Sequence, residues 1–371
     1  MTLELPRALL EDWLREAYFT AVHDISSSGV EPYSMADLRA ALDIPLDTFD
    51  TVVFRDSHSR GAAELRAAVA ARFGCGDAAE VMITNGSCEA EFLFMTSFLD
   101  AGDEVIVVDP AYHTLGVLAV NAGCRVVPWR LRPQNGFRPD VGELRSLASE
   151  STKAIIVNLP HNPTGMSVGP EEMAQIIDIA AECDAYLVWD SVFRELVYDV
   201  SPLPDITTVY GKSVSFGSLS KAYGLPGLRI GWAFMPDHLI ERCVVIRDYS
   251  TYAPSPLAEH VALHAVRGAD VLLGRRVERA RANLEYLQKW AHQHRSVVEF
   301  SRPDGGVCAF PKLLGIPDTW AFCEKLMNDG GVLLVPGECF GVPGHVRLGF
   351  GGESDSFRAG LAQLSLALLK E

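Results

Sequence analysis

The residues best suited to covalent chemistry lie between positions 218 and 232. A single lysine, Lys221, stands there among two serines, three glycines and one arginine. A buried lysine near another cation can lose its proton, and the neutral amine can then form an imine with a carbonyl compound. Ser218, Ser220 and Arg229 offer donors for a phosphate on the same ligand. A carbonyl together with a phosphate describes pyridoxal phosphate (PLP), and the alternative is a solvated glycine-rich loop.

A second possible phosphate site follows the short β-branched run 81–84. Gly86, Ser87 and Cys88 come next and open a helix that we expect to reach Leu99. Backbone N–H groups at the start of a helix point outward and bind anions well. Many strand-to-helix turns carry glycine and serine, so the pattern alone also fits an ordinary turn.

Three further residues follow expected strands, where open α/β sheets bind their ligands. Tyr112 follows strand 104–108 and could stack on a pyridine ring or belong to the core. Asn162 lies in a loop that prolines and a glycine make rigid. Asp190 directly follows a strand, where its carboxylate could pair with a protonated pyridine nitrogen or cap a helix.

Arg347 and a serine-rich loop are the remaining candidates. Arg347 lies in the expected strand 346–350 and is either paired at the surface or a bidentate clamp for a carboxylate. Residues 24–33 read DISSSGVEPY, in which glycine and proline force a loop and three consecutive serines offer hydroxyl groups. This loop is either part of a binding pocket or a plain connector.

The elements that would position these residues alternate between strand and helix over residues 81–217, which predicts a mostly parallel sheet covered on both faces. Helical spacing predicts an N-terminal helix at 9–22 and another at 61–73. We expect an N-terminal segment (1–40) packing with a small domain, a large domain (41–270) and a small α+β domain (271–371). The elements expected after residue 232 are helices 239–249, 256–266, 277–294, 320–327 and 357–369 and strands 307–310, 332–335 and 346–350.

Composition limits the class of function. The chain has 371 residues, is 48% hydrophobic and carries a formal charge of −16, which speaks against nucleic acid and anionic membrane as partners. Its eight cysteines, Cys75 among them, form no Cys-x-x-Cys pair, so we expect buried thiols in the reducing cytoplasm and no metal site. Residues 1–10 lack a basic start followed by a hydrophobic block, so no signal peptide or membrane span is expected.

Taken in order, these motifs resemble the fold type I PLP enzymes of the aspartate aminotransferase type over nearly the whole chain. The resemblance implies an α/β fold with a mostly parallel seven-stranded sheet, and a homodimer with active sites at the interface. It implies that Lys221 forms the imine with PLP, Asp190 pairs with the pyridine nitrogen, Asn162 binds the ring oxygen and Tyr112 stacks on the ring. The residues it implies for the phosphate are Gly86, Ser87, Cys88, Ser218, Ser220 and Arg229. Arg347 would bind the carboxylate of an amino-acid substrate.

Two positions depart from this pattern. Phe193 stands where aminotransferases commonly place a tyrosine that donates to the ring oxygen, and residues 54–60 lack the tyrosine that reaches the partner's phosphate. Similarity to the capreomycidine synthase and streptolidine-pathway group of cyclases accounts for both. The matching segments are 11–15, 23–30, 54–56, 190–193 and 247–249.

That similarity implies a cyclase acting on 3-hydroxy- or 3,4-dihydroxyarginine in antibiotic biosynthesis. Lys221 would remove the α-proton, the β-hydroxyl would leave, and the guanidine would add to the same carbon, giving capreomycidine or a streptolidine lactam. Ser27, Ser28, Gly29 and Asn162 would join Arg347 around the substrate. The candidates to accept the guanidinium are Asp24, Glu31, Asp56 and Asp248. An aminotransferase for a basic amino acid is the alternative, and a PLP-bound regulator is disfavoured by the negative charge and the lack of a DNA-binding segment.

Overall fold

The structure is a computed structural model that describes residues 5–74 and 76–370. The expectations for the first four residues and for Cys75 therefore lie outside the described residues. Within the described ranges, no helix is long and apolar enough to cross a membrane.

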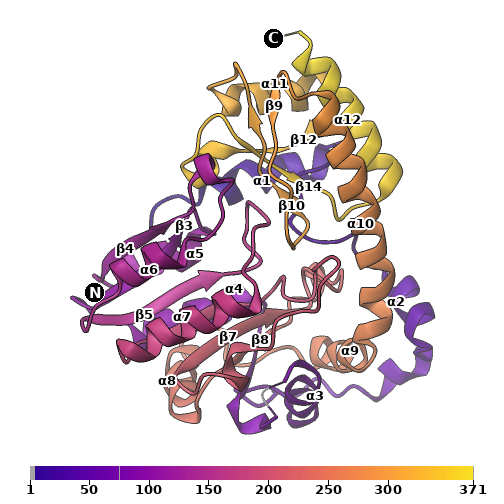
Figure 1. Ribbon diagram of the computed structural model, residues 1–371. Helices are drawn as coiled ribbons and strands as arrows, with labels where there is room; N and C mark the ends of the chain where they lie inside the picture. The colour runs from indigo at the N-terminus through magenta and orange to yellow at the C-terminus, as the bar shows by residue number, and fades with distance from the viewer. Residues whose placement is uncertain (1–4, 75, 371) are drawn as a thin grey trace.

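A seven-stranded sheet forms the centre of the molecule (Figure 1). Its strands run in the order β2-β8-β7-β6-β5-β3-β4. β4, β3, β5, β6 and β7 are parallel to one another, and β8 is antiparallel to both of its neighbours. The mostly parallel sheet expected from the sequence is confirmed. The strands are β2 (Val81–Thr84), β3 (Glu104–Asp109), β4 (Arg125–Arg130), β5 (Thr152–Asn158), β6 (Tyr186–Asp190), β7 (Ser213–Ser218) and β8 (Gly231–Phe234).

Helices cover both faces of this sheet. In β3, Val105 and Val107 pack into one apolar cluster, while Ile106 and Val108 pack into another on the opposite face. Alternate side chains of a strand point to opposite faces, so a strand buried on both faces must be apolar throughout. The first cluster contains residues of α4 (Ser87–Phe98), α5 (His113–Asn121) and α8 (Asp237–Arg247), and the second contains residues of α6 (Val141–Leu147) and α7 (Pro170–Glu182).

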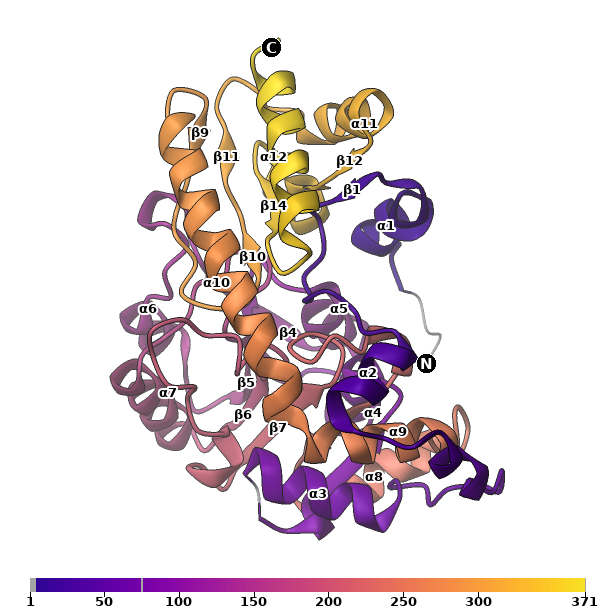
Figure 2. The ribbon, with the colours of Figure 1, turned by 90° about the vertical axis from the view of Figure 1, so that its right-hand side faces the viewer.

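The C-terminal part of the chain is built around one long helix. α10 (Ala269–Gln293) runs from α9 (Pro256–Arg267) to the end of the molecule that carries the C-terminus (Figures 1 and 2). It lies beside a three-stranded antiparallel sheet in the order β10-β14-β13. The remaining elements are β9 (Val298–Glu299), β10 (Cys308–Ala309), β11 (Lys312–Leu313), α11 (Thr319–Gly330), β12 (Val332–Leu333), β13 (Val335–Pro336), β14 (Val346–Gly349) and α12 (Ser354–Leu368).

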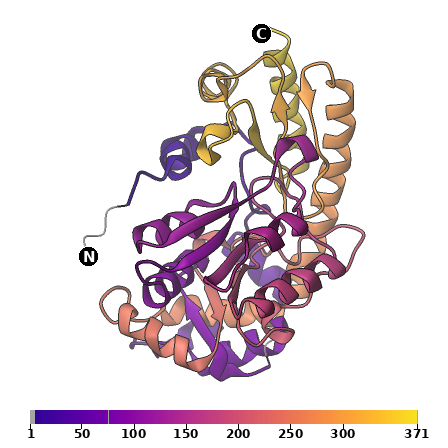
Figure 3. The same cartoon turned by 60° about the vertical axis from the view of Figure 1, so that its left-hand side comes forward.

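The N-terminal segment packs against this C-terminal part (Figure 3). β1 (His23–Asp24) pairs in parallel with β12. The indole N–H of Trp13, in α1 (Leu9–Thr20), donates to the carbonyl of Leu334 at 2.7 Å. The chain then crosses back through α2 (Met35–Leu42) to α3 (Ala63–Phe73), beside the large sheet. Short 3₁₀ helices occur at Leu46–Thr51, Ala78–Glu80, Pro133–Asn135, Ile206–Thr208, Pro226–Leu228 and Gly337–Phe340.

Several expected elements differ from the observed ones. The expected strand 332–335 is two strands, because β12 pairs with β1 while β13 pairs with β14. The helix expected at 277–294 begins eight residues earlier, at Ala269. Four cysteines, Cys88, Cys124, Cys183 and Cys339, are only half-buried rather than buried, although every described cysteine is free.

Candidate active site

Lys221 lies in the turn that follows β7, and its Nζ donates to the hydroxyl of Ser28 at 2.8 Å. Burial and the nearby Arg347 guanidinium lower the pKa of Lys221. Both effects disfavour the ammonium form, as a nucleophilic or basic amine requires. The serine-rich loop therefore contacts the lysine directly and is not a plain connector.

Asp190 is the last residue of β6 and is almost fully buried. Its Oδ2 accepts from Asn158 Nδ2 at 3.0 Å, and its Oδ1 accepts from the N–H of Val192 at 3.2 Å. Burial raises the pKa of Asp190 to about 7. Residues after Asp190 form a turn rather than a helix, which excludes the helix-cap interpretation.

Asn158 links two of the expected residues, although the sequence reading assigned it no role. It ends β5 and lies in register with Asp190 on β6. Its amide donates to Asp190, while its Oδ1 accepts from the N–H of Asn162 at 2.9 Å. Two polar residues ending neighbouring parallel strands were the available signal, because such ends meet at one edge of the sheet.

Arg347 is buried, with 2% of its surface exposed, which excludes a surface ion pair. Its Nε and Nη2 donate to the carbonyl of Ser26 at 3.2 and 3.0 Å. Its Nη1 donates to Asn162 Oδ1 at 3.2 Å. One guanidinium thus holds the serine-rich loop and the asparagine loop together. Since it has five N–H groups, two remain for a ligand.

The expected phosphate residues meet around two glycines. Gly86 has a positive φ of 85°, and a Cβ there would lie 2.3 Å from Arg229 Nη2. A Cβ on Gly231 would lie 2.5 Å from the backbone nitrogen of Ser87, at the start of α4. Gly231 is in register with Ser218, whose hydroxyl donates to Ser220 Oγ at 2.8 Å. The start of α4, the two serine hydroxyls and the Arg229 guanidinium therefore lie close together, and the two glycines permit this close packing.

Tyr112 lies at the start of α5 and reaches across to both α4 and α1. Its hydroxyl donates to Glu11 Oε1 at 3.0 Å and lies 3.6 Å from the sulfur of Cys88. Burial raises the pKa of Cys88 to about 11, so the thiol is neutral. These polar contacts exclude a purely apolar core role for Tyr112. Glu11 was not singled out from the sequence, because one glutamate in a helical pattern looks like an ordinary solvated residue.

Glu91 is a second buried carboxyl group near Asp190. It lies in α4, is 1% exposed, and accepts a hydrogen bond from the hydroxyl of Thr114. Burial and the neighbouring Asp190 raise the pKa of Glu91 well above its ordinary value, which favours its neutral form. A lone glutamate in the otherwise apolar run 90–95 was the signal for it.

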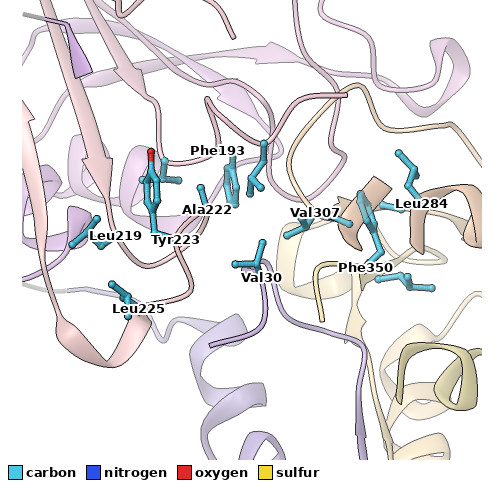
Figure 4. Close-up of a cluster of buried hydrophobic side chains, with 14 of the residues drawn as sticks. Val30, Phe193, Leu219, Ala222, Tyr223, Leu225, Leu284, Val307 and Phe350 are labelled. Carbon is cyan, nitrogen blue, oxygen red and sulfur yellow. The ribbon is translucent and has the colours of Figure 1, made fainter. Parts of the chain in front are cut away.

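The other expected residues of the serine-rich loop serve the loop itself. Ser27 Oγ accepts from the N–H of Gly29 at 3.1 Å and does not contact Lys221. A Cβ on Gly29 would lie 3.4 Å from the carbonyl oxygen of Ser220, so the loop backbone rests on the lysine turn. Phe193 lies beside Ala222 and above Val30 in an apolar cluster (Figure 4).

Glu31 is not available to bind a substrate guanidinium, which corrects one expectation. It pairs with Arg276, at 2.7 Å, and with Arg279, both from α10. Asp24 Oδ1 accepts from the N–H and hydroxyl of Ser26 at 2.8 and 2.6 Å. Asp56 and Asp248 are exposed, and no hydrogen bond joins either to the lysine turn in the described part of the chain.

The donor set fits PLP. An amine with a lowered pKa suits the aldehyde, a buried carboxyl suits the ring nitrogen, and the hydroxyls, guanidinium and helix start beside Gly86 and Gly231 suit the phosphate. These donors can lie this close together because neither glycine has a Cβ. Lys221, Asp190, Asn162 and Arg229 could therefore hold the cofactor.

The chain is similar to one known protein family and to named proteins of known sequence. Residues 52–364 match the family model for aminotransferase class I and II. The chain is 46% identical to capreomycidine synthase of Streptomyces vinaceus, over 97% of this chain and 93% of that protein. It is 30% identical to aspartate aminotransferase of Thermotoga maritima, over 78% of this chain and 77% of that protein.

A solved structure supports the same relationship. The crystal structure of the PLP-dependent cyclase OrfR superposes with a TM-score of 0.94 and 41% identity, covering 100% of this chain and 99% of that chain. The fold type I architecture and the PLP cofactor expected from the sequence are confirmed. The match over residues 52–364 and these relatives show that the chain belongs to the aminotransferase class I and II family.

Proposed function

We propose that this protein is a PLP-dependent cyclase that converts a hydroxylated L-arginine to a cyclic guanidino amino acid. The observation that carries the proposal is the 2.8 Å contact between Ser28 and Lys221. In this contact the serine-rich loop, which belongs to one of the segments that resemble the cyclase group, touches the residue that we assign to the α-proton. The 46% identity with a protein named capreomycidine synthase supports the same assignment.

The proposed roles follow from the contacts of each residue. The two unused N–H groups of Arg347 bind the substrate α-carboxylate, because a guanidinium matches a carboxylate in bidentate geometry. Lys221 removes the α-proton and later returns it, since burial and Arg347 lower the pKa of its amine and so favour the basic, unprotonated form. Ser28 orients Nζ for both transfers. When bound, PLP withdraws electron density from the substrate α-carbon, with Asp190 as counter-ion to its ring nitrogen.

The net reaction is the loss of one water. The bond from the β-carbon to its hydroxyl oxygen breaks, a bond from a guanidino nitrogen to the same carbon forms, and the α-amino group stays in the product. Holding the guanidine against the β-carbon is a positioning task, and such positioning can lower a barrier by roughly 7–11 kcal/mol. No keto acid takes part in this balance.

Mass spectrometry of the product tests the proposal. The protein is incubated with 3-hydroxyarginine, and separately with 3,4-dihydroxyarginine, without any keto acid. We expect a product lighter by one water that keeps the α-amino group, and no product from the Lys221→Ala variant. Turnover only after addition of 2-oxoglutarate or pyruvate would refute cyclisation in favour of an aminotransferase for a basic amino acid, which the family membership also allows.

We also infer a homodimer acting in the cytoplasm. Val53 and Phe54 are 67% and 80% exposed, and Tyr249 is 91% exposed. Val53 and Phe54 precede Ser59, and Tyr249 follows Arg247. Arg247 joins these two stretches of chain by donating to the carbonyl of Ser59 at 2.8 Å. Exposed apolar groups of this size commonly mark a protein interface. Light scattering should give twice the chain mass. The cytoplasm is inferred from the cysteines, because free thiols are typical of a reducing compartment.

A further inference from the structure

Glu11 is an exposed carboxylate on α1 that the roles described so far leave unused. Its Oε1 accepts from Tyr112, whose ring is the one expected to stack on the cofactor. Tyr112 in turn lies 3.6 Å from Cys88, and the Cys88 thiol is close enough to Lys221 for the lysine to affect its pKa. Two short contacts therefore connect Glu11 to the neighbourhood of the lysine.

The carboxylate of Glu11 can accept further hydrogen bonds. It is exposed, and among the described residues no hydrogen bond or ion pair reaches its Oε2. The two arginines nearest in sequence, Arg7 and Arg15, both pair with Asp12 instead. His113, beside Tyr112, does not neutralise it, because burial lowers the pKa of this imidazole despite the nearby Glu11 carboxylate.

The other acidic candidates are less well placed. Glu31 is held by two arginines of α10. Asp24, like Glu11, has one oxygen bound by another side chain, but it is only half-exposed on β1, where it pairs with β12, and no hydrogen bond among the described residues joins it to Tyr112. Glu91 and Asp190 are buried, and burial raises the pKa of each carboxyl group, which disfavours the ionised form. A substrate guanidinium is permanently charged and needs an ionised partner with a free oxygen.

We propose that Glu11 binds the guanidinium of the substrate, with Oε2 accepting from the guanidinium while Oε1 stays bound to Tyr112. This inference rests on the proposed function for its substrate class. The substrate would then be held at both ends, by Arg347 at the α-carboxylate and by Glu11 at the side chain. The stacking tyrosine between them fixes the orientation of the carboxylate. α1, which Trp13 anchors to the C-terminal part of the chain, would set specificity.

Calorimetric titration of the PLP-loaded protein with two ligands that cannot be cyclised by loss of water tests this assignment. L-arginine has the guanidinium but no β-hydroxyl to lose, and L-citrulline replaces the guanidinium with a neutral urea of the same shape. The wild type should bind arginine at least about ten-fold more tightly than citrulline, equivalent to about 1.4 kcal/mol. Glu11→Gln should remove this preference, since glutamine can still accept from Tyr112 but carries no charge.

Glu16→Gln is the matched control, because Glu16 is also an exposed glutamate of α1. It should keep the preference for arginine, and both variants should keep the wild-type melting temperature. Loss of the preference in Glu11→Gln alone supports the assignment even if neither hydroxyarginine is cyclised. A preference that survives in Glu11→Gln overturns it even if cyclisation occurs, as does equal binding of arginine and citrulline by the wild type.

Discussion

Replacing Asp190 with asparagine should change how the stability of the cofactor-free protein depends on pH. Asp190 is buried in the folded state, and its pKa is raised from 3.8 to about 7. In the unfolded chain the carboxyl ionises near its ordinary pKa. Between these two values the folded state holds a proton that the unfolded state has lost. Stability from this group is therefore fully present below about pH 4 and is lost as the pH rises to about 7.

The size of the effect follows from the shift. A difference of about three pKa units corresponds to about 4 kcal/mol at pH values above both. Between about pH 5.5 and about pH 8, the part lost is about 2 kcal/mol. Asparagine does not titrate, so the Asp190→Asn variant lacks this loss. Removing the Asp190 charge also lowers the pKa of the neighbouring Glu91, which can only reduce the loss in the variant further, so about 2 kcal/mol is the smallest expected difference. Its altered hydrogen bonds with Asn158 and Val192 contribute equally at both pH values and cancel in the comparison.

Urea unfolding of both proteins without PLP, at these two pH values, measures the effect. The stability of the variant minus that of the wild type should increase by at least about 2 kcal/mol from the lower to the higher pH. Asp178→Asn, at an exposed position on α7, is the control and should show no such increase. An Asp190→Asn difference that is the same at both pH values would refute the reasoning, because it would mean that burial does not hold the proton on Asp190.

Two further substitutions test the close packing at Gly86 and the contribution of the buried Arg247. Gly86→Ala should weaken PLP binding at least about ten-fold in a fluorescence titration, because the new Cβ would lie 2.3 Å from Arg229 Nη2 and would push the guanidinium away; an unchanged Kd would contradict the crowding argument. Arg247→Met should lower the free energy of unfolding by about 3–5 kcal/mol, because it removes a fully buried guanidinium that pairs with Glu89 and donates to the carbonyls of Ser59 and Ile83. A loss no larger than that of the exposed control Arg242→Met would speak against this account.

The central site could be predicted from the sequence because its residues end strands or follow them closely. The position of a strand end limits where Asp190 and Lys221 can be, and parallel pairing brings those ends to one edge. The large sheet was predictable for a related reason, since its strands are buried on both faces and read as apolar runs. α5 was not expected, because its largely apolar sequence does not show a polar face.

Contacts between distant segments could not be predicted in this way. Ser28 and Lys221 are 193 residues apart, and Glu11 and Tyr112 are 101 apart. Glu31 pairs with two arginines of α10, which are far from it in sequence. The sequence shows which charged residues exist but not which of them are paired. Pairing depends on how the N-terminal segment crosses the molecule, which no local pattern encodes.

The crossing itself constrains how the site can move. Val30 donates its N–H to the carbonyl of Lys221 at 3.1 Å, and the next residue, Glu31, donates its N–H to the carbonyl of Gly351 at 3.1 Å. Neighbouring peptide groups are thus bonded to two separate parts of the chain, one to the turn that follows β7 and one to the residues that follow β14. A rigid displacement of one part against the other by more than a fraction of a hydrogen-bond length would break one of these bonds. Residues 30 and 31 therefore fix the separation between the lysine turn and the C-terminal part of the chain.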